Sequence, residues 1–448
     1  MNFILTKGLD IPISGEPEQS IQQGNPVTEV ALLGFDTIGL KPSMAVRVGD
    51  QVASGQLLYR DKQNKGVQFT APVAGQITAI HRGPRRHFES MVIQREGDEQ
   101  LSFSSGYQPR DPLPDAATIK EILVASGQWT ALRTRPYGKV PALNAEPASL
   151  FITAMDSQPL AADPTVIIKA YRDDFVLGLQ LLQALIPKTF LCVDPGPPLP
   201  GSDLPGLEVA RFSGPHPAGL ASTHIHFLDP IQANKEVWHL GYQDVIATGH
   251  LFRTGNLQSE RVIALSGPAM QRPRLIKTLA GASLLELCQN ESAAHSRLIA
   301  GSVLSGHTLG KDGVHGYLGR YQQQVCVLPE KDGSGFLSWL RPGSDRYSCL
   351  PLFFSSLRKS PTFPLTTASW GGRRAILPIG TYEKVMPLNF ITTALLKSIA
   401  TGNTEKAADL GCLELIEEDL ALCSFVCPGK NNFGPMLRDI LTKIEEDG

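Results

Sequence analysis

Near the end of the chain stands the stretch Ala421-Leu422-Cys423-Ser424-Phe425-Val426-Cys427-Pro428-Gly429-Lys430, which decides how the C-terminal domain is interpreted. Its spacing, C-x3-C-P, is the second half of the iron–sulfur motif C-x2-C-x2-C-x3-C-P, in which closely spaced thiolates converge on iron. The first two cysteines would fall at Glu417 and Leu420, and neither side chain supplies a thiolate. The stretch is therefore either a chance match in a helix-rich tail or the remnant of a cluster site.

Composition sets the outer limits of the interpretation. A chain of 448 residues is too long for one core, so three or four domains are expected. The net charge of -2 gives no general attraction for nucleic acid. Seven scattered cysteines argue against a disulfide framework and indicate a reducing compartment.

The same reading predicts a soluble, cytoplasmic chain. Met1–Asp10 has only a three-residue apolar run before its first charge, so it is no signal peptide. The longest uncharged apolar run, Phe175–Pro187, is too short to cross a bilayer. We expect no transmembrane helix, and membrane contact only through partner proteins.

Residues 1–100 are predicted to form a β domain with an N-terminal segment. Short strands between glycine and proline turns are expected over residues 27–95, for example at Ala45–Val48. Val46–Leu58 and Thr70–Ile77 resemble the two halves of the β hammerhead of biotinyl and lipoyl carrier domains. Lys62 could be a carrier lysine, but the insertion after it displaces it from the required two-residue hairpin tip, so no lipoate or biotin is expected.

Residues 101–256 change to alternating strand and helix. Thr165–Ala170 and Phe190–Val193 are predicted strands, and a helix capped by Asp173 or Asp174 lies between them. This βαβ unit predicts a Rossmann-like α/β domain with a parallel sheet. No G-x-G-x-x-G follows a strand, which argues against a dinucleotide cradle.

One run in this domain combines rings and positive charges, Ser126–Lys139. Its side chains could form a slot for a planar ring with donors for carbonyl oxygens, made by Trp129, Arg133, Arg135, Tyr137 and Lys139. On residue type alone, a surface loop with Trp129 buried as an anchor is the better interpretation.

No metal site is predicted. Thr223–His226 places two imidazoles on one face of an expected strand, but no third ligand stands nearby, so satisfied strand histidines are favoured. Gly306–Lys311 fails the spacing of a phosphate loop. The glycines of residues 257–330 fit the loops of a small β-grasp domain better; a connector over 331–376 and a helical domain over 377–448 follow.

The order of hammerhead, Rossmann-like, β-grasp and helical domains resembles two related redox proteins: the NADH-oxidising flavin subunit of complex I and the RnfC subunit of the Rnf complex. In those families the segment matching Ser126–Pro136 is a glycine-rich flavin loop. Bulky residues replace its glycines at Gln128–Thr134, so backbone can no longer approach a flavin closely. This second loss favours a lost cluster over a chance match at Cys423, Cys427 and Pro428.

Nearly the whole chain is similar to the NqrA family, whose members are subunits of the bacterial Na+-translocating NADH:quinone oxidoreductase. The similarity rests on long runs: Lys7–Ile13, Trp129–Pro136, Thr153–Asp156, Gly214–Ala221 and Glu418–Cys423. It implies a peripheral protein on the cytoplasmic face of the bacterial inner membrane, with no flavin, cluster or other redox cofactor of its own. Its partners would be five other subunits, chiefly the membrane subunits.

The resemblance further implies an NADH:ubiquinone reductase, Na+-transporting, in which this chain is one component and not a catalyst alone. That family has been linked to quinone binding. Ubiquinone would then enter the slot around Trp129, with Leu33 and Phe35 on the opposite wall. The alternative is a purely structural assembly protein without a quinone site.

Overall fold

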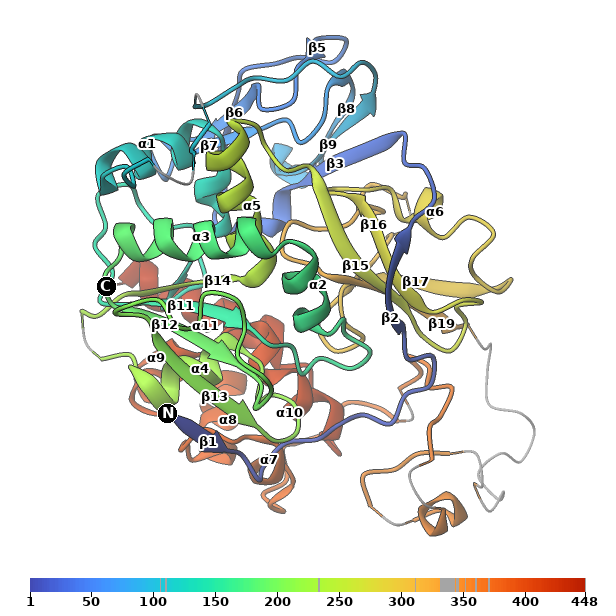
Figure 1. Ribbon diagram of the computed structural model, residues 1–448. Helices are drawn as coiled ribbons and strands as arrows, with labels where there is room; N and C mark the ends of the chain where they lie inside the picture. Colours follow the sequence, from blue (N-terminus) through green and yellow to red (C-terminus); the bar gives the residue numbers. More distant parts are fainter. Residues whose placement is uncertain are drawn as a thin grey trace.

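Four sheets, the helices that accompany them and a C-terminal group of helices make up the described part of the protein (Figure 1). The computed structural model describes residues 1–104, 106–108, 111–232, 234–310, 312–330, 343, 346–350, 352–358, 361–369 and 371–447. The first part of the predicted connector, residues 331–342, lies outside these described residues.

The N-terminal domain is all β, as predicted, and packs two small sheets face to face at the top of Figure 1. Their strands are β3 (Glu29–Leu33), β4 (Pro42–Met44), β5 (Gln51–Val52), β6 (Leu57–Asp61), β7 (Gln68–Thr70), β8 (Gly75–Arg82) and β9 (Phe88–Arg95). The Tyr59 ring stacks on Phe69 of the neighbouring strand and lies edge-on to Phe88 of the other sheet, at 5.3 Å. The strand expected at Ala45–Val48 is wrong, because the ladder with β6 ends at Met44.

The second domain is built on a six-stranded sheet in the order β1-β13-β12-β11-β14-β10. All neighbouring pairs are parallel except β14 and β10. Its strands are β1 (Asn2–Ile4), β10 (Arg133–Arg135), β11 (Leu150–Ala154), β12 (Thr189–Val193), β13 (Glu208–Ser213) and β14 (Val237–Gly241).

Alternation along these strands buries both faces of the sheet. Leu150 and Ile152 of β11 belong to the core that contains α3 (Arg172–Leu185) and α5 (Tyr242–Thr254). Phe151 points to the opposite core, beneath α4 (Ala221–Leu228). Two further helices, α1 (Ala116–Ala125) and α2 (Pro164–Ala170), complete the domain.

The strand predicted at Thr165–Ala170 is wrong, because this segment is helix α2. Asp163 accepts a hydrogen bond from the Thr165 N–H (2.8 Å), and Pro164 occupies the first helical position. This cap and proline are a helix-start signal, and a short apolar run alone does not distinguish helix from strand. The first strand of the βαβ unit is β11, whereas the strand predicted at Phe190–Val193 is present in β12.

The third domain has a six-stranded mixed sheet in the order β18-β17-β19-β15-β16-β2. It comprises β2 (Glu18–Gln23), β15 (Glu260–Ser266), β16 (Arg274–Leu279), β17 (Ser296–Ala300), β18 (His307–Thr308), β19 (Gln324–Pro329) and the short helix α6 (Leu284–Leu287). The N-terminal residues therefore do not all belong with residues 27–100. β1 completes the second sheet and β2 the third.

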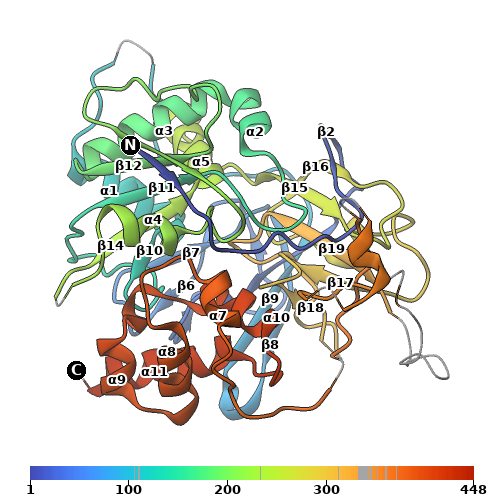
Figure 2. The same ribbon diagram turned by 90° about the horizontal axis from the view of Figure 1, so that it is seen from below.

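Helices dominate the last part of the chain and pack together below the second domain (Figure 2). They are α7 (Thr381–Val385), α8 (Thr392–Thr401), α9 (Thr404–Asp409), α10 (Ala421–Val426) and α11 (Phe433–Asp447). Gly402 ends α8 in a left-handed conformation, as the predicted stop requires. Asn403 rather than Thr404 caps α9, and α8 begins at Thr392 rather than at Pro387. Across the described residues no helix combines the length and apolar character needed to cross a membrane.

Candidate functional site

A large cavity lies where the order of the parallel strands reverses. From β11 the chain adds β12 and β13 on one side, and then β14 on the other side. Ligands of open α/β sheets bind at such a switch point, outside the carboxyl ends of the strands. Here the cavity, with a volume of about 710 Å³, is lined by Thr153 and Asp156 at the carboxyl end of β11 and by Gly241 and Tyr242 at the carboxyl end of β14.

Every domain contributes to this switch-point cavity. The N-terminal domain supplies Phe35 and Asp36, the third domain supplies Ser302 and Tyr321, and the C-terminal helices supply Glu418 among others. A volume of this size is within the range of small-molecule sites, roughly 300–1,000 Å³. The arrangement therefore provides a partly open site at a four-domain junction.

Four lining residues carry buried polar atoms with no hydrogen-bond partner in the described structure: Arg133 Nε, Thr153 Oγ1, Gln158 Oε1 and Tyr242 Oη. Buried polar groups are normally paired, since an unmade bond costs about 1–3 kcal/mol. An N–H, two hydroxyls and an amide oxygen at one cavity suit a ligand that has carbonyl or other polar groups.

Arg133 and Tyr321 form one wall of the cavity. The guanidinium carbon lies 4.7 Å from the centre of the Tyr321 ring, which is cation–π geometry. The Tyr321 hydroxyl donates to the Thr130 carbonyl (2.8 Å) and so holds the ring in place. Phe35 adds a second ring, edge-on to His307 at 4.6 Å. The wall thus offers a fixed aromatic surface beside a cation.

Asp156 is the carboxyl of the cavity with the most perturbed ionisation. Burial raises the pKa of Asp156 to about 7, and the Glu418 and Asp194 carboxylates act in the same direction. The Gln158 N–H donates to Asp156 Oδ1 (2.8 Å) and offsets only part of this. At neutral pH this carboxyl therefore holds a proton in a large fraction of molecules.

Asp156→Asn is expected to stabilise the protein at alkaline pH only. The unfolded aspartate has a pKa near 3.9, so the folded state holds the extra proton between about pH 4 and 7, and stability falls as pH rises through that window. Asparagine removes this loss, which predicts a gain of about 1–3 kcal/mol near pH 8 and almost none near pH 4. Urea unfolding at both pH values measures this gain in the free energy of unfolding, and the exposed Asp203→Asn is the control. Equal gains at both pH values would contradict the raised pKa of Asp156.

A second, smaller cavity adjoins the first and shares Asp36 and Tyr321 with it. Its volume is about 120 Å³, and Leu33, Phe69 and Leu318 contribute apolar walls. Burial raises the pKa of Asp36 to about 6, against the opposing hydrogen bond from the Arg320 N–H (2.9 Å). The two cavities together form one chamber, whose smaller part is a recess with apolar walls.

The slot predicted around Trp129 is not formed. Trp129 is 1% exposed, packs edge-on against Trp238 at 5.3 Å, and donates from Nε1 to the Pro141 carbonyl (3.0 Å). Arg135 is fully buried, with Nε bonded to Ser222 Oγ (3.1 Å). Both side chains are used in packing between elements, so the alternative interpretation of Trp129 as a buried anchor is the one observed.

Tyr137 and Lys139 also lie away from both cavities. The Tyr137 carbonyl accepts a bond from Arg438 (2.8 Å), and Lys139 Nζ forms an ion pair with Glu445 on α11 (2.6 Å). These residues attach the second domain to the C-terminal helices. Of the seven predicted contact residues, the structure brings Arg133 and Phe35 to the large cavity and Leu33 to the small one.

The degenerate cluster loop lies in the core of the C-terminal helices. Cys423 and Cys427 are both 1% exposed and carry free thiols. The Sγ of Cys427 lies 3.1 Å from the Tyr382 hydroxyl and accepts from the Asn431 N–H (3.4 Å). Burial disfavours the thiolate of Cys427, but these donors outweigh it and lower its pKa. Pro428 follows in the turn after α10.

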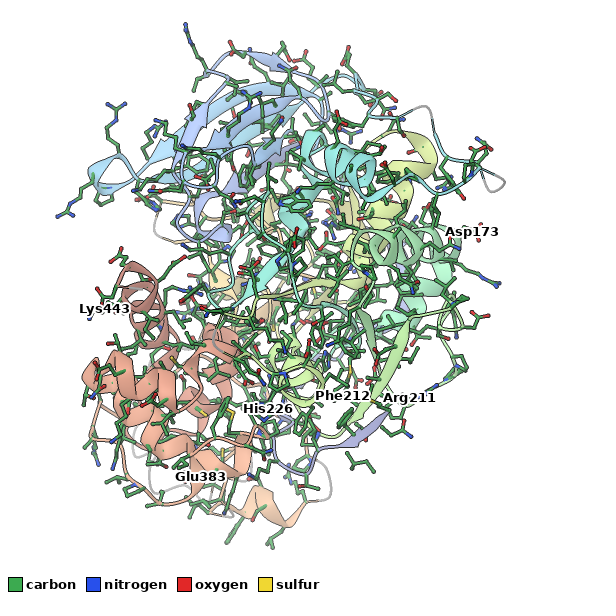
Figure 3. The ribbon with its side chains drawn as sticks, turned by 90° about the vertical axis from the view of Figure 1, so that its left-hand side faces the viewer. Asp173, Arg211, Phe212, His226, Glu383 and Lys443 are labelled. Atoms are coloured by element: carbon green, nitrogen blue, oxygen red, sulfur yellow. The ribbon has the colours of Figure 1, made fainter. Side chains whose placement is uncertain are left out.

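The two histidines expected on a strand lie instead on helix α4, where they cannot share a face two residues apart. His224 is buried with Nε2 3.0 Å from the Ala218 carbonyl, and His226 Nδ1 pairs with Glu414 (2.7 Å). Figure 3 shows His226 at the boundary between the second domain and the C-terminal helices. Among the described residues no cluster of three or more His, Cys, Asp or Glu side chains could hold a metal ion.

Comparisons with known proteins agree with one another. Three models of the NqrA family match the chain: the N-terminal barrel-sandwich hybrid domain at residues 3–96, the second alpha/beta domain at 114–257 and the C-terminal domain, of the SLBB type, at 262–311. The NqrA protein of Histophilus somni, a component of the Na(+)-translocating NADH-quinone reductase, is 51% identical over 446 residues, 99% of either chain. The chain belongs to the NqrA family.

Other NqrA proteins are equally similar. The Hahella chejuensis protein is 51% identical over 449 residues and that of Haemophilus influenzae 50% identical over 447, each with 99% of both chains covered. A solved NAD+-reducing NiFe-hydrogenase shares 13% identity and 52% of each chain at a TM-score of 0.35, too weak a likeness for any inference. The multidomain α/β fold of the NqrA family, with barrel-sandwich, α/β and SLBB domains, is thereby established for this chain.

Several cavity residues were not found by sequence reasoning. Thr153–Asp156 stands out in the sequence only as one of the runs similar to the NqrA family, and no motif marks Gln158. Tyr321 lies far along the chain in a glycine-rich loop, and Tyr242 begins α5 without any motif. A strand followed by a polar turn is a usable signal, but the loop of Tyr321 reaches the cavity only through domain packing.

Proposed function

We propose that this chain acts as the NqrA component of an Na+-translocating NADH:ubiquinone reductase, in the quinone-reducing half of the electron transfer that is coupled to Na+ export. The carrying observation is about 50% identity over 99% of the chain to proteins named as this component. The proposed partners are five other subunits, chiefly those in the membrane, with no nucleic acid. The proposed location is the cytoplasmic face of the bacterial inner membrane.

Complex membership has a direct test. The chain is expected to copurify from solubilised membranes with a sodium-dependent NADH:quinone activity, and not to catalyse that reaction alone. Recovery of the chain only as a free protein, from cells that have the activity, would contradict the assignment.

Within that complex, the switch-point cavity is the proposed ubiquinone site. A quinone headgroup is a planar ring with two carbonyl acceptors. Arg133 Nε and the hydroxyls of Thr153 and Tyr242 are donors left unpaired within the described structure, and Tyr321 and Phe35 supply the aromatic walls. The proposal thus keeps Arg133 and Phe35 from the sequence prediction and gives the ring contact to Tyr321 in place of Trp129. The apolar recess near Leu33 would face the ring's substituents.

Titration of the purified chain with a short-chain ubiquinone analogue tests this site. Tyr321→Ala is expected to weaken binding about tenfold, since an aromatic wall and its cation contribute roughly 1–2 kcal/mol. Tyr137→Ala is the matched control, because Tyr137 lines neither cavity. Binding no stronger than partition into lipid would favour the alternative, a purely structural role. A loss in Tyr137→Ala but not in Tyr321→Ala would return the site to the predicted slot.

The chain is further proposed to hold no flavin, iron–sulfur cluster, lipoate or biotin. Support comes from the positions concerned: buried Gln128–Ala131 occupies the would-be flavin loop, Glu417 is paired with Arg438, and Leu420 is fully buried. A descent shared with RnfC and the complex I flavin subunit, with a Rossmann-like second domain, would explain both losses. The purified chain should be colourless and contain no iron. Its intact mass should show no modification of Lys62.

A further inference from the structure

Residues 346–380 have an unusual charge balance for this chain. They contain five basic residues and no acidic one, although the whole chain has a net charge of -2. The basic residues are Arg346, Arg358, Lys359, Arg373 and Arg374. A stretch of this length with no carboxylate attracts anionic partners.

The same segment exposes large apolar side chains. Leu350, Leu352, Phe354 and Leu357 are 57%, 70%, 64% and 83% exposed, within only eight residues. Single exposed leucines are ordinary, but four large apolar side chains together on one short segment mark an interaction surface. Phe354 and Leu357 are the first and last residues of η5 (Phe354–Leu357), the short orange helix that projects from the body of the molecule in Figure 1.

Contacts with the body hold this segment from behind. The ring of Tyr347 lies 5.8 Å from that of Phe363 and 6.3 Å from that of Phe425. Phe363 in turn exchanges backbone hydrogen bonds with Pro12 and Ser14 (2.8 and 2.9 Å). The rings of Tyr347 and Phe363 thus anchor the segment to the body of the protein. The four exposed apolar side chains described above do not take part in these contacts.

The same segment also carries exposed positive charges. Arg358, Arg373 and Arg374 are exposed, and none of the ion pairs found in the described residues involves them. Leu377 and Ile379, 50% and 59% exposed, follow directly in sequence. Exposed apolar side chains and exposed arginines therefore occur together at both ends of this segment, at residues 350–358 and 373–379.

We propose that the described part of residues 346–379 binds the surface of an anionic lipid bilayer. The projecting leucines and Phe354 enter the boundary between headgroups and acyl chains, while Arg358, Arg373 and Arg374 pair with lipid phosphates. Projecting apolar side chains with interspersed arginines are the composition of interfacial membrane segments. Membrane contact is then direct, in addition to any contact through partner proteins.

Sedimentation of the full chain with protein-free vesicles tests this proposal. Binding is expected to phosphatidylglycerol-containing vesicles, to be weaker for pure phosphatidylcholine, and to fall as salt rises. Arg358→Gln with Arg374→Gln should weaken it about fivefold per arginine. Leu352→Glu with Phe354→Glu should lower it at least as much, and Leu285→Glu, at an exposed leucine of the third domain, should leave it unchanged.

Three outcomes would overturn the proposal. They are no binding to phosphatidylglycerol vesicles, equal binding of the paired variants and the Leu285→Glu control, or binding only to membranes that contain the partner proteins. The last would make the segment a protein-docking surface. The arginine variants leave the apolar packing untouched, so a folding failure of the glutamate variants would not decide the result.

Discussion

Replacing Asp244 by alanine is expected to destabilise the protein by about 3–5 kcal/mol, as removal of one partner of a buried ion pair generally does. Asp244 is 5% exposed, and its Oδ1 accepts from Arg261 (2.6 Å) and Arg320 (2.7 Å). Burial favours the neutral acid, but the two guanidinium groups outweigh it and lower the pKa of Asp244. Without the carboxylate, the two partly buried arginines lose their shared negative partner.

Because of the position of Asp244, its loss is expected to weaken contacts between domains. It lies on α5 of the second domain, Arg261 and Arg320 belong to the third, and the Arg320 N–H donates to Asp36 of the N-terminal domain. Urea unfolding should show the loss, with exposed Asp173→Ala near zero. If orphaned charge is the cause, adding Arg320→Ala to Asp244→Ala should cost less than the sum of the single changes. Strict additivity would contradict this.

Gly249→Val is expected to destabilise by about 3 kcal/mol or more through overpacking. Gly249 of α5 faces α3, where an added Cβ would lie 1.8 Å from the Asp174 carbonyl oxygen. Gly178 of α3 is in the same situation on the facing helix, because an added Cβ there would lie 2.1 Å from the Val245 carbonyl oxygen. The two helices thus touch backbone to backbone, and a valine would force them apart.

Thermal unfolding of Gly249→Val measures this cost. Gly196→Val is the matched control, since an added Cβ there meets nothing within 4 Å. Equal losses of stability in the two variants would indicate a general effect of replacing glycine by valine, and not an effect of the contact between α3 and α5. Because α5 begins at the switch-point cavity, binding at the proposed ubiquinone site should weaken along with stability.

Elements with strong local signals were predictable from the sequence. The glycine turns of the N-terminal domain and the stop of α8 at Gly402 depend on backbone conformation that few other residues adopt. The apolar face of α3 likewise follows from its period. Thr165–Ala170 failed because a short apolar-rich run fits either a strand or a helix, and its Asp-Pro cap was the deciding signal.

The site was harder because it depends on packing between domains. Arg133 and Arg135 are adjacent on one face of β10, yet one reaches the cavity and the other is sealed beneath α4, bonded to Ser222. Because both residues are arginines, the sequence alone does not show which of them reaches the cavity. Trp129 carries the same lesson: an indole is as suited to a ligand wall as to a core, and only its contact with Trp238 decides between them.

The two N-terminal strands can pair only after much of the rest of the chain has been synthesised. β1 pairs with Arg211–Ser213 and β2 with residues from Arg274 onward, so each waits for more than 200 residues of later chain before it has a partner. Such distant pairings close slowly. During translation the N-terminal domain between residues 27 and 95 can fold first, while the two flanking strands remain unpaired edges open to chaperones. The earliest part of the chain to be made is thus among the last to be placed.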